Sequence, residues 1–221
     1  DNIWKLFEQL KACRGSASVS ISATGGVQTW PFAPAMDPPM LGQGSANVSS
    51  PGLLHATAWA EAYELIDLQL SPLGLRAIEA LGVGSGDIVL DIGCGAGQTL
   101  LQLAERVGTE GQVIGVDVAP LLLEIAKRRT EALSQVRLIQ ADAQTLDLPS
   151  ESTDAVFSRF GVMTFNDPVV AFANFRRILR PSGALAFSCW RSLQENELDH
   201  LPLSAAGFQS TVDAGPFSFA D

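Results

Sequence analysis

An acidic residue and three regularly spaced glycines form the segment of this sequence best suited to bind a ligand. Asp91 is followed, at every second position, by Gly93, Gly95 and Gly97. Glycines at a turn let the backbone approach a ligand closely, because no Cβ is in the way. If a helix begins there, its free N–H groups add partial positive charge that suits an anionic group. The segment therefore predicts a ligand-binding turn between a strand and a helix.

The spacing of these glycines distinguishes between two classes of ligand. A dinucleotide-binding fingerprint, G-x-G-x-x-G, needs its third glycine at position 98, where this chain has Gln98. The acidic residue ahead of the first glycine suits a ligand that presents an amine rather than a pyrophosphate. An oxidoreductase that uses a nicotinamide dinucleotide on a similar fold is the alternative to be tested.

Two further acidic residues stand at the ends of expected strands. Asp117 lies 20 residues after Gly97, where a carboxylate accepts hydrogen bonds from ribose hydroxyls. Asp142 is placed to accept a hydrogen bond from the exocyclic amine of adenine, with the backbone of Ala143 completing the base edge. A structural role is the other interpretation of both, as the cap of a helix for Asp117 and of a turn for Asp142.

These residues are positioned by a regular alternation of apolar strand runs and amphipathic helices. Such an alternation predicts a parallel sheet that is covered on both faces. Right-handed crossovers then give an α/β, doubly wound, Rossmann-like fold. The expected strands are 88–90, 112–118, 136–141, 154–158 and 184–190, and the expected helices are 53–69, 72–81, 96–107, 120–133 and 168–179.

The two ends of the chain differ in character from this alternating region. Residues 1–14 have the amphipathic pattern of a short helix. Residues 15–60 contain a single charged residue and are dominated by Gly, Ser, Ala, Thr and Pro, so we expect a loop-like segment there. The tail at 191–221 has no clear strand pattern and is expected to be irregular. The expected organisation is an N-terminal segment at 1–50 with no assigned role and a Rossmann-like domain at 51–221.

The glycine turn and the acidic strand ends together resemble the class I S-adenosylmethionine-dependent methyltransferases. The similarity covers about residues 51–191, with the motifs in the family's order. The run at 179–185, Leu-Arg-Pro-Ser-Gly-Ala-Leu, looks like the turn before the family's fifth strand. Segments 160–163 and 217–221 are similar to one bacterial branch that acts on small molecules, the quinone and sterol methyltransferases. The other matching segments are 89–97, 113–118, 140–143 and 154–160.

The resemblance implies that S-adenosyl-L-methionine is the cofactor and that the turn and the strand ends hold it. The methionine end would lie at the glycine turn, the ribose on Asp117, and the adenine on Asp142 and Ala143. Backbone around Ser158 and Arg159 would face the methionine amine and the methyl group. The residues expected to bind the cofactor are Asp91, Gly93, Cys94, Gly95, Gly97, Asp117, Val118, Asp142, Ala143, Ser158 and Arg159.

The function that the resemblance implies is transfer of a methyl group to a small organic acceptor. The sulfonium methyl is already electrophilic, so the protein mainly aligns the acceptor with it and excludes water. A general base for a hydroxyl acceptor would be His200 or Asp167, and nothing in their spacing favours either. A truncated module that binds the cofactor without catalysing transfer is the second alternative.

The family's usual C-terminal strand pair has no counterpart in this sequence. Members usually continue past the fifth strand into a helix and an antiparallel pair of strands at the sheet edge. This chain ends before any such pair, so we expect a sheet that is truncated at its C-terminal edge. An unpaired edge promotes aggregation unless a loop or a partner covers it.

Composition argues against several other classes of protein. The 221 residues carry a formal net charge of −10, and a field of that sign repels nucleic acid. No apolar run reaches the roughly 18 to 20 residues needed to span a membrane. Three cysteines without a C-x-x-C pair, and two histidines, offer no zinc-ligand spacing and suit a reducing compartment. A secretory signal pattern is not found either, so we expect a cytoplasmic protein without a bound metal.

Overall fold

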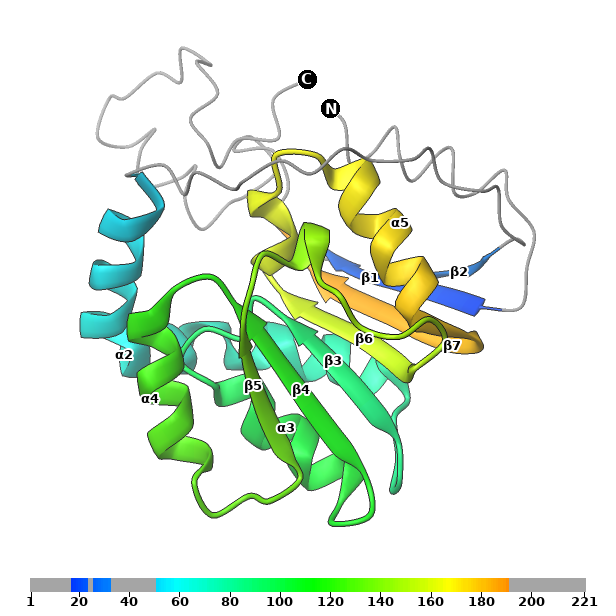
Figure 1. The fold of residues 1–221 in the computed structure, drawn as a ribbon, viewed down its shortest axis with the longest axis horizontal. Coiled ribbons are helices and arrows are strands. Elements are labelled where there is room, and N and C mark those ends of the chain that lie inside the picture. The colour runs from blue at the N-terminus through cyan, green and yellow to red at the C-terminus, as the bar shows by residue number, and fades with distance from the viewer. Residues whose placement is uncertain (1–16, 24–25, 33–50, 191–221) are drawn as a thin grey trace.

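A mostly parallel β-sheet forms the centre of the molecule (Figure 1). The computed structural model describes residues 17–23, 26–32 and 51–190. The strand order is β2-β1-β7-β6-β3-β4-β5, and every neighbouring pair is parallel except β1 with β2. The strands are β1 (Ala17–Ala23), β2 (Gly26–Phe32), β3 (Ile88–Ile92), β4 (Gln112–Asp117), β5 (Val136–Gln140), β6 (Thr153–Arg159) and β7 (Leu179–Ser188).

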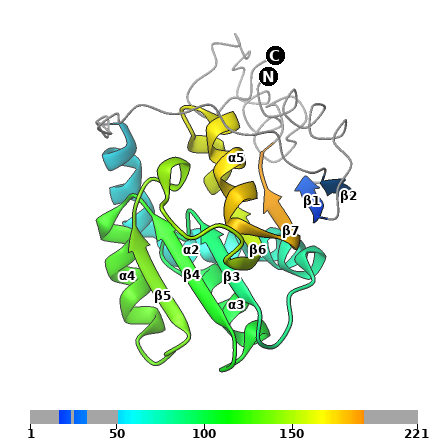
Figure 2. The same ribbon diagram turned by 45° about the vertical axis from the view of Figure 1, so that its right-hand side comes forward.

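Helices cover both faces of this sheet (Figures 1 and 2). Helix α5 packs on one face together with the short 3-10 helices η1 and η2, and helices α2, α3 and α4 pack on the other. This arrangement confirms the doubly wound, Rossmann-like α/β fold. The helices are α2 (Pro51–Leu81), α3 (Gln98–Val107), α4 (Pro120–Thr130), α5 (Pro168–Ile178), η1 (Ala143–Thr145) and η2 (Gly161–Thr164).

The central strand β3 shows why the strands read as continuous apolar runs. Leu90 and Ile92 belong to the core on the α5 face, whereas Val89 belongs to the core on the opposite face. Because side chains alternate along a strand and both faces are covered, apolar residues suit both sets of positions, and Asp91 is the one polar residue of this strand. The strands and helices expected between residues 88 and 190 agree with the structure to within a few residues, except that β7 begins earlier, at Leu179.

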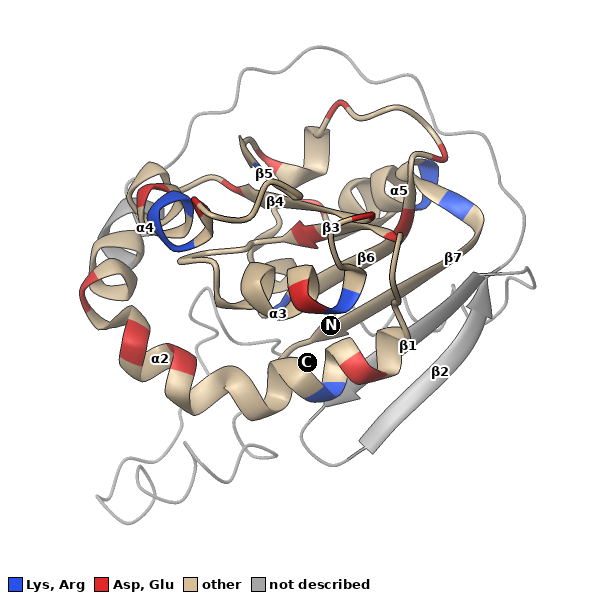
Figure 3. Cartoon of the chain, turned by 90° about the horizontal axis from the view of Figure 1, so that it is seen from below, with Lys and Arg blue, Asp and Glu red and all other residues tan. Residues whose placement is uncertain are grey.

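Helix α2 corrects the expectation of two separate helices at 53–69 and 72–81. It runs without interruption from Pro51 to Leu81 and contains Pro72 in its interior. A proline there lacks the N–H donor and crowds the preceding turn, which bends a helix, and α2 bends midway along its length (Figure 3). The part after Pro72 places Ala77, Ile78 and Leu81 in the core, and the part before it reaches the glycine turn.

Strands β1 and β2 correct the expectation of a loop over these residues. Strand β1 pairs in parallel with β7, from Ser18 opposite Ala184 to Ser22 opposite Ser188, and β2 pairs with β1 antiparallel. Pro31 lies in β2, at the sheet edge, where a residue without an N–H donor is tolerated. The edge of β7 that we expected to be truncated is therefore paired by a segment from the opposite end of the sequence.

Two expectations lie outside the described residues, namely the helix at 1–14 and the irregular tail at 191–221. Among the helices that the structure describes, none combines the length and the hydropathy that a membrane span requires.

Candidate functional site

The glycine turn lies directly after β3, and the end of β4 holds it. The N–H groups of Gly93 and Cys94 both donate to the carbonyl oxygen of Val116, at N···O distances of 2.8 and 3.1 Å. Gly93 has φ 69°, and a Cβ on it would lie 2.7 Å from the Cα of Gly161 at the start of η2. Two backbones therefore meet here at a distance that only glycine permits.

Gly95 and Gly97 serve different purposes in the same turn. Gly95 has φ 53°, and a Cβ built on it would meet no heavy atom within 4 Å, so its bare Cα faces open space. Gly97 is the N-cap of α3, and a Cβ there would lie 3.0 Å from Ala126 of α4. Gly95 therefore leaves room for a ligand, whereas Gly97 lets two helices pack closely.

Asp91 is fully buried beneath this turn. Its Oδ2 accepts a hydrogen bond from the Thr99 hydroxyl at 2.5 Å, and its Oδ1 has no partner among the described residues. Burial raises the pKa of Asp91 to about 7, although the Thr99 hydrogen bond and the charge of Arg159 both oppose the rise. A buried carboxylate oxygen without a donor is costly unless a ligand supplies one.

Asp117 joins the end of β4 to the glycine turn. Its Oδ2 accepts a hydrogen bond from the Gly95 N–H and its Oδ1 accepts one from the Ala119 N–H, both at 2.9 Å. Burial raises the pKa of Asp117, and these backbone hydrogen bonds oppose the rise. Val118, the next residue, is 49% exposed beside this carboxylate.

Asp142 and Ala143 follow β5, on the far side of β4 from the glycine turn. Both carboxylate oxygens of Asp142 accept hydrogen bonds from Gln144, and one of these bonds, from the Gln144 N–H at 2.9 Å, caps η1. Ala143 is buried, and its carbonyl oxygen accepts a hydrogen bond from Asn174 at 3.3 Å. The capping role considered for Asp142 is therefore present in the structure.

Ser158 and Arg159 close β6 and occupy different environments. The Ser158 hydroxyl donates to the carbonyl oxygen of Ile92 at 2.7 Å and accepts from the Gly161 N–H at 3.1 Å. It therefore connects the end of β3, directly before the glycine turn, to the start of η2. Arg159 instead extends toward α2, where its guanidinium donates to Asp67 at 3.1 Å and to Gln98.

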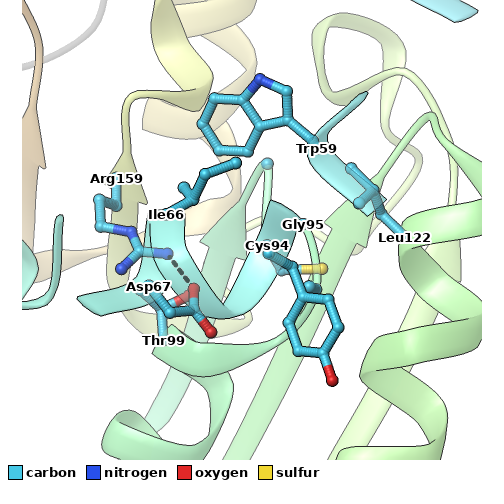
Figure 4. Close-up of a pocket in the computed structure, with 11 residues that line it drawn as sticks. Trp59, Ile66, Asp67, Cys94, Gly95, Thr99, Leu122 and Arg159 are labelled. Atoms are coloured by element: carbon cyan, nitrogen blue, oxygen red, sulfur yellow. Dashed lines mark hydrogen bonds and ion pairs between the residues drawn. The ribbon is translucent and has the colours of Figure 1, made fainter. Parts of the chain in front are cut away.

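A pocket opens between the glycine turn and the first part of α2 (Figure 4). It encloses about 350 Å³ of space, including the part that is open to solvent. Of the residues expected to bind the cofactor, Gly93, Cys94, Gly95 and Arg159 line it. Burial raises the pKa of the Cys94 thiol well above its ordinary value, so this thiol stays protonated. The other residues that line it are Trp59, Tyr63, Ile66, Asp67, Ala96, Thr99 and Leu122.

The remaining expected residues do not line this pocket. Asp91 is hydrogen bonded to Thr99, which lines the pocket, whereas Ser158 is hydrogen bonded to Ile92, which does not, and Gly97 packs against α4. The expected residues at the ends of β4 and β5 stand at the same carboxyl edge of the sheet but outside the pocket wall; they are Asp117, Val118, Asp142 and Ala143.

The residues that the sequence did not reveal come chiefly from α2. Trp59, Tyr63, Ile66 and Asp67 have the spacing i, i+4, i+7, i+8, which places them on one face of a helix. That periodicity was a usable signal, but it does not say which neighbour a helix face covers. Asp67 is a buried acid, and its partner Arg159 is 92 positions away, so no sequence pattern links the two.

Of the two suggested general bases, the structure describes only Asp167, and this residue does not line the pocket. Asp167 is exposed, and it caps α5 by accepting a hydrogen bond from the Val170 N–H at 3.0 Å. His200 lies outside the described residues. Within the described ranges, no group of three or more His, Cys, Asp or Glu side chains is arranged to hold a metal ion.

Comparison with known proteins finds a family that matches the region carrying this site. A model of the methyltransferase domain matches residues 90–187, which run from the middle of β3 to the end of β7. A solved structure of an S-adenosylmethionine-dependent methyltransferase from Aquifex aeolicus is 25% identical. It aligns with a TM-score of 0.51 over 61% of this chain and 78% of that one.

Two curated proteins share a similar region. Aklanonic acid methyltransferase DauC of Streptomyces sp. (strain C5) is 37% identical over 120 residues, which are 53% of this chain and 54% of that protein. Demethylmenaquinone methyltransferase of Staphylococcus aureus (strain JH9) is 34% identical over 108 residues, 49% of this chain and 45% of that protein. The chain thus spans about half the length of the curated relatives it matches.

Proposed function

We propose that this chain is a class I S-adenosylmethionine-dependent methyltransferase, and that it transfers a methyl group from that cofactor to a small organic acceptor. The observation that carries the proposal is the glycine turn, where Gly95 faces open space and Asp117 is held against its N–H. This turn lies within the region that matches the methyltransferase domain.

The residues present at the turn fit an aminoacyl-nucleoside. Space beside Gly95 accommodates a ligand atom where any other residue would place a Cβ. The buried Oδ1 of Asp91 lacks a hydrogen bond, and an ammonium group near the turn would give it a favourable electrostatic partner. S-adenosylmethionine carries such a group, and when bound it supplies a methyl group on a positively charged sulfur.

Asp117 is the residue that we assign to the ribose. Each of its carboxylate oxygens accepts one backbone hydrogen bond, from Gly95 or from Ala119. An ionised carboxylate has about four lone-pair sites, so each oxygen can still accept a hydroxyl. Because these hydrogen bonds already fix the carboxylate, the entropic cost of binding the ligand is smaller.

We assign the adenine to the surface formed by Val118, Asp142 and Ala143. Val118 offers an exposed apolar side chain next to Asp117, against which a flat base can pack. Asp142 keeps lone pairs on its oxygens beyond its hydrogen bonds to Gln144. Both residues stand at the carboxyl ends of neighbouring strands, β4 and β5, where ligands of open α/β sheets bind.

The role of the pocket in the reaction is to align the acceptor and exclude water. Trp59, Ile66 and Leu122 surround the space above the turn (Figure 4). Apolar walls of this kind bind an organic molecule and strengthen the electrostatic interactions inside. Alignment of the acceptor atom with the methyl group supplies the main rate advantage, because methyl transfer from a sulfonium needs no protein nucleophile.

A small organic molecule is the acceptor class that the relatives support. The two curated relatives bear the names of small molecules, aklanonic acid and demethylmenaquinone. A dinucleotide oxidoreductase has no comparable support. Gln98 stands where its fingerprint requires a glycine, and the side chain of Gln98 is hydrogen bonded to Arg159 and to the backbone of Asp67.

The proposal is tested by calorimetry on this chain with S-adenosylhomocysteine, the demethylated product, and with NADH. We expect saturable binding of S-adenosylhomocysteine and none of NADH. Incubation with methyl-labelled S-adenosylmethionine and a panel of phenols, quinols and organic acids then identifies the acceptor. Binding of NADH alone contradicts the proposal, and cofactor binding without transfer to any acceptor favours a non-catalytic module.

A further inference from the structure

Gln144 makes the hydrogen bonds that the Asp142 carboxylate receives from the described residues. Its backbone N–H donates to Oδ1 at 2.9 Å, and its side-chain amide nitrogen lies 3.1 Å from Oδ1 and 2.9 Å from Oδ2. The backbone bond caps η1, and any residue other than proline could supply it. The two side-chain bonds depend on the amide, so they are what a glutamine adds at this position.

The start of α5 fixes which end of the Gln144 amide faces Asp142. The Oε1 of Gln144 accepts a hydrogen bond from the Asp167 N–H at 2.8 Å. Asp167 is itself held there as the N-cap of α5, because its Oδ1 accepts from the Val170 N–H at 3.0 Å. An amide whose oxygen meets a backbone N–H presents its NH2 group on the other side. Gln144 therefore connects α5 to Asp142 and acts on the carboxylate as a donor.

These hydrogen bonds occupy the two oxygens of Asp142 unequally. Oδ1 accepts two of them, whereas Oδ2 accepts one. Each oxygen of a carboxylate has about two lone-pair sites, so a further donor is accepted most readily at Oδ2. Asp142 is half-buried at the carboxyl edge of the sheet, where ligands of open α/β folds bind. Gln144 thus gives this carboxylate one preferred direction for a further donor.

We propose that Gln144 is a positioning residue that holds Asp142 so that its Oδ2 accepts the exocyclic amine of the cofactor's adenine, which sets a preference for an amino purine over an oxo purine. The inference rests on the proposed function, in which Asp142 is assigned to the adenine. Hypoxanthine has an oxygen where adenine has its amine, and a carboxylate oxygen repels it. A carboxylate that neighbouring hydrogen bonds hold in place discriminates between the two bases more sharply than one that can turn away.

The test compares S-adenosylhomocysteine with S-inosylhomocysteine, its deaminated counterpart, by calorimetry on the full chain. We expect the unmodified chain to prefer S-adenosylhomocysteine by at least about tenfold, the scale of a hydrogen bond to a charged group. In Gln144→Leu, the affinity for S-adenosylhomocysteine should fall by about 3- to 10-fold, because Asp142 loses both amide contacts. The affinity for S-inosylhomocysteine should change by less than about twofold, so the preference shrinks.

A double-mutant cycle shows whether Gln144 acts through Asp142. Once Asp142→Ala has removed the carboxylate, adding Gln144→Leu should change the affinity for S-adenosylhomocysteine by less than about twofold. Gln144→Glu isolates the same contact, since it keeps an oxygen for the Asp167 N–H and places a second carboxylate against Asp142. It should lose at least as much affinity as Gln144→Leu, and it replaces the leucine variant if that one does not fold in a thermal melt.

Gln102→Leu is the matched control. Gln102 is a half-buried glutamine of α3, on the opposite face of the sheet from η1, and its side-chain amide donates to the Ser71 hydroxyl at 3.0 Å. The same change of side chain should leave both affinities within about twofold of those of the unmodified chain.

Several outcomes overturn the inference. Equal losses for both ligands in Gln144→Leu, or a loss that persists after Asp142→Ala, would show that Gln144 only stabilises η1. Full affinity in Gln144→Glu would show that the hydrogen bond to Asp167 is sufficient. Equal binding of the two ligands by the unmodified chain would remove Asp142 from the adenine and leave the proposed function standing. Failure of the unmodified chain to bind either ligand would instead refute the proposed function itself.

Discussion

Asp91 is the residue at which burial and charge are most directly in conflict. Its side chain has no exposed surface, it receives one hydrogen bond from Thr99, and its pKa rises from the ordinary value of 3.8 to about 7. The folded chain therefore holds a proton on this residue at pH values where the unfolded chain has released it. Groups perturbed in this way concentrate at functional sites, and Asp91 lies beneath the candidate ligand site.

Asp91→Asn should change the pH dependence of stability. Between pH 3.8 and about 7 the folded state binds more protons than the unfolded state, so the free energy of unfolding falls as pH rises. Asparagine keeps an acceptor for Thr99 and does not titrate. From pH 5 to pH 8 we expect the unmodified chain to lose about 2–3 kcal/mol relative to the variant.

Urea denaturation at the two pH values measures this difference in the free energy of unfolding. Asp117 titrates in both proteins, so its contribution cancels when the two are compared. Parallel pH profiles for the variant and the unmodified chain would show that Asp91 is already ionised at pH 5.

Asp117→Ala should weaken binding of S-adenosylhomocysteine by about 1–3 kcal/mol, the scale of lost hydrogen bonds to a charged group. The variant removes both the proposed ribose acceptor and the partner of the Gly95 N–H. Calorimetry provides the affinity. Asp87→Ala is the control, because Asp87 also accepts a backbone N–H, from Gly84 at 2.8 Å, in a turn away from the site. Equal affinities in the two variants would exclude Asp117 from the site.

At the scale of elements, the site depends on a turn and a helix that are fixed independently. The turn is fastened to β4 by backbone hydrogen bonds to Val116, whereas α2 is held over it by the side chains of Asp67 and Arg159. The position of the turn therefore depends on the backbone of β4, and the position of α2 depends on side chains, including the core residues Ala77, Ile78 and Leu81.

Gly95→Ala should separate the stability of the turn from its role in binding. Alanine at φ 53° costs about 1–2 kcal/mol, because its Cβ crowds the backbone in the left-handed region. Its Cβ also enters the space that we assign to the ligand, so the affinity for S-adenosylhomocysteine should fall at least about tenfold. Chemical denaturation and calorimetry measure the two effects.

Gly82→Ala is the matched control for this variant. Gly82 has φ 71° and, like Gly95, has no heavy atom within 4 Å of a Cβ, but it follows the end of α2. It should lower stability by a similar amount without changing affinity. If both variants bind equally well, the open space at Gly95 is not part of the ligand site.

The helices and strands that the sequence predicted well are those whose own residues carry an apolar pattern. Strand β3 and its neighbours are apolar because both faces of the sheet are covered, and each helix alternates with them. Strands β1 and β2 carry no such signal, since β1 consists mostly of Ser and Ala and pairs with a distant strand, and β2 contains Gly26 and Pro31. Pro72 misled the prediction of α2 for a different reason, because a bent helix tolerates a proline that usually ends one.

The residues of the candidate site also fall into two groups, those that a sequence motif indicates and those that only the fold brings together. The turn from Asp91 to Gly97 and the acids at positions 117 and 142 have motif spacing, so the sequence alone could propose them as binding residues, and these roles stay predictions. The pairing of Asp67 with Arg159 depends on where a helix face meets a strand end, which only the three-dimensional structure defines.

At the scale of the whole molecule, β1 and β2 complete the sheet beyond β7. An uncovered β7 would present a row of free N–H and C=O groups to other molecules. All the described site residues belong to the part of the chain that begins with α2. The sheet edge and the ligand site are therefore separable.

A chain that begins at Pro51 should associate while keeping the ligand site. Light scattering should show oligomers that grow with protein concentration, because the edge of β7 is exposed. The affinity for S-adenosylhomocysteine should stay within about twofold of that of the full chain. A monomeric shortened chain with unchanged stability would show that β1 and β2 do not protect this edge.

The pairing of Ser18 with Ala184 has a consequence for synthesis. The N-terminal strand leaves the ribosome long before its neighbour exists, and at about 5–20 residues per second the interval is on the order of 10–30 s. A two-stranded hairpin alone is marginally stable in water. The nascent chain must therefore keep this segment from mispairing, and its final β-sheet order is reached only after translation has passed residue 188.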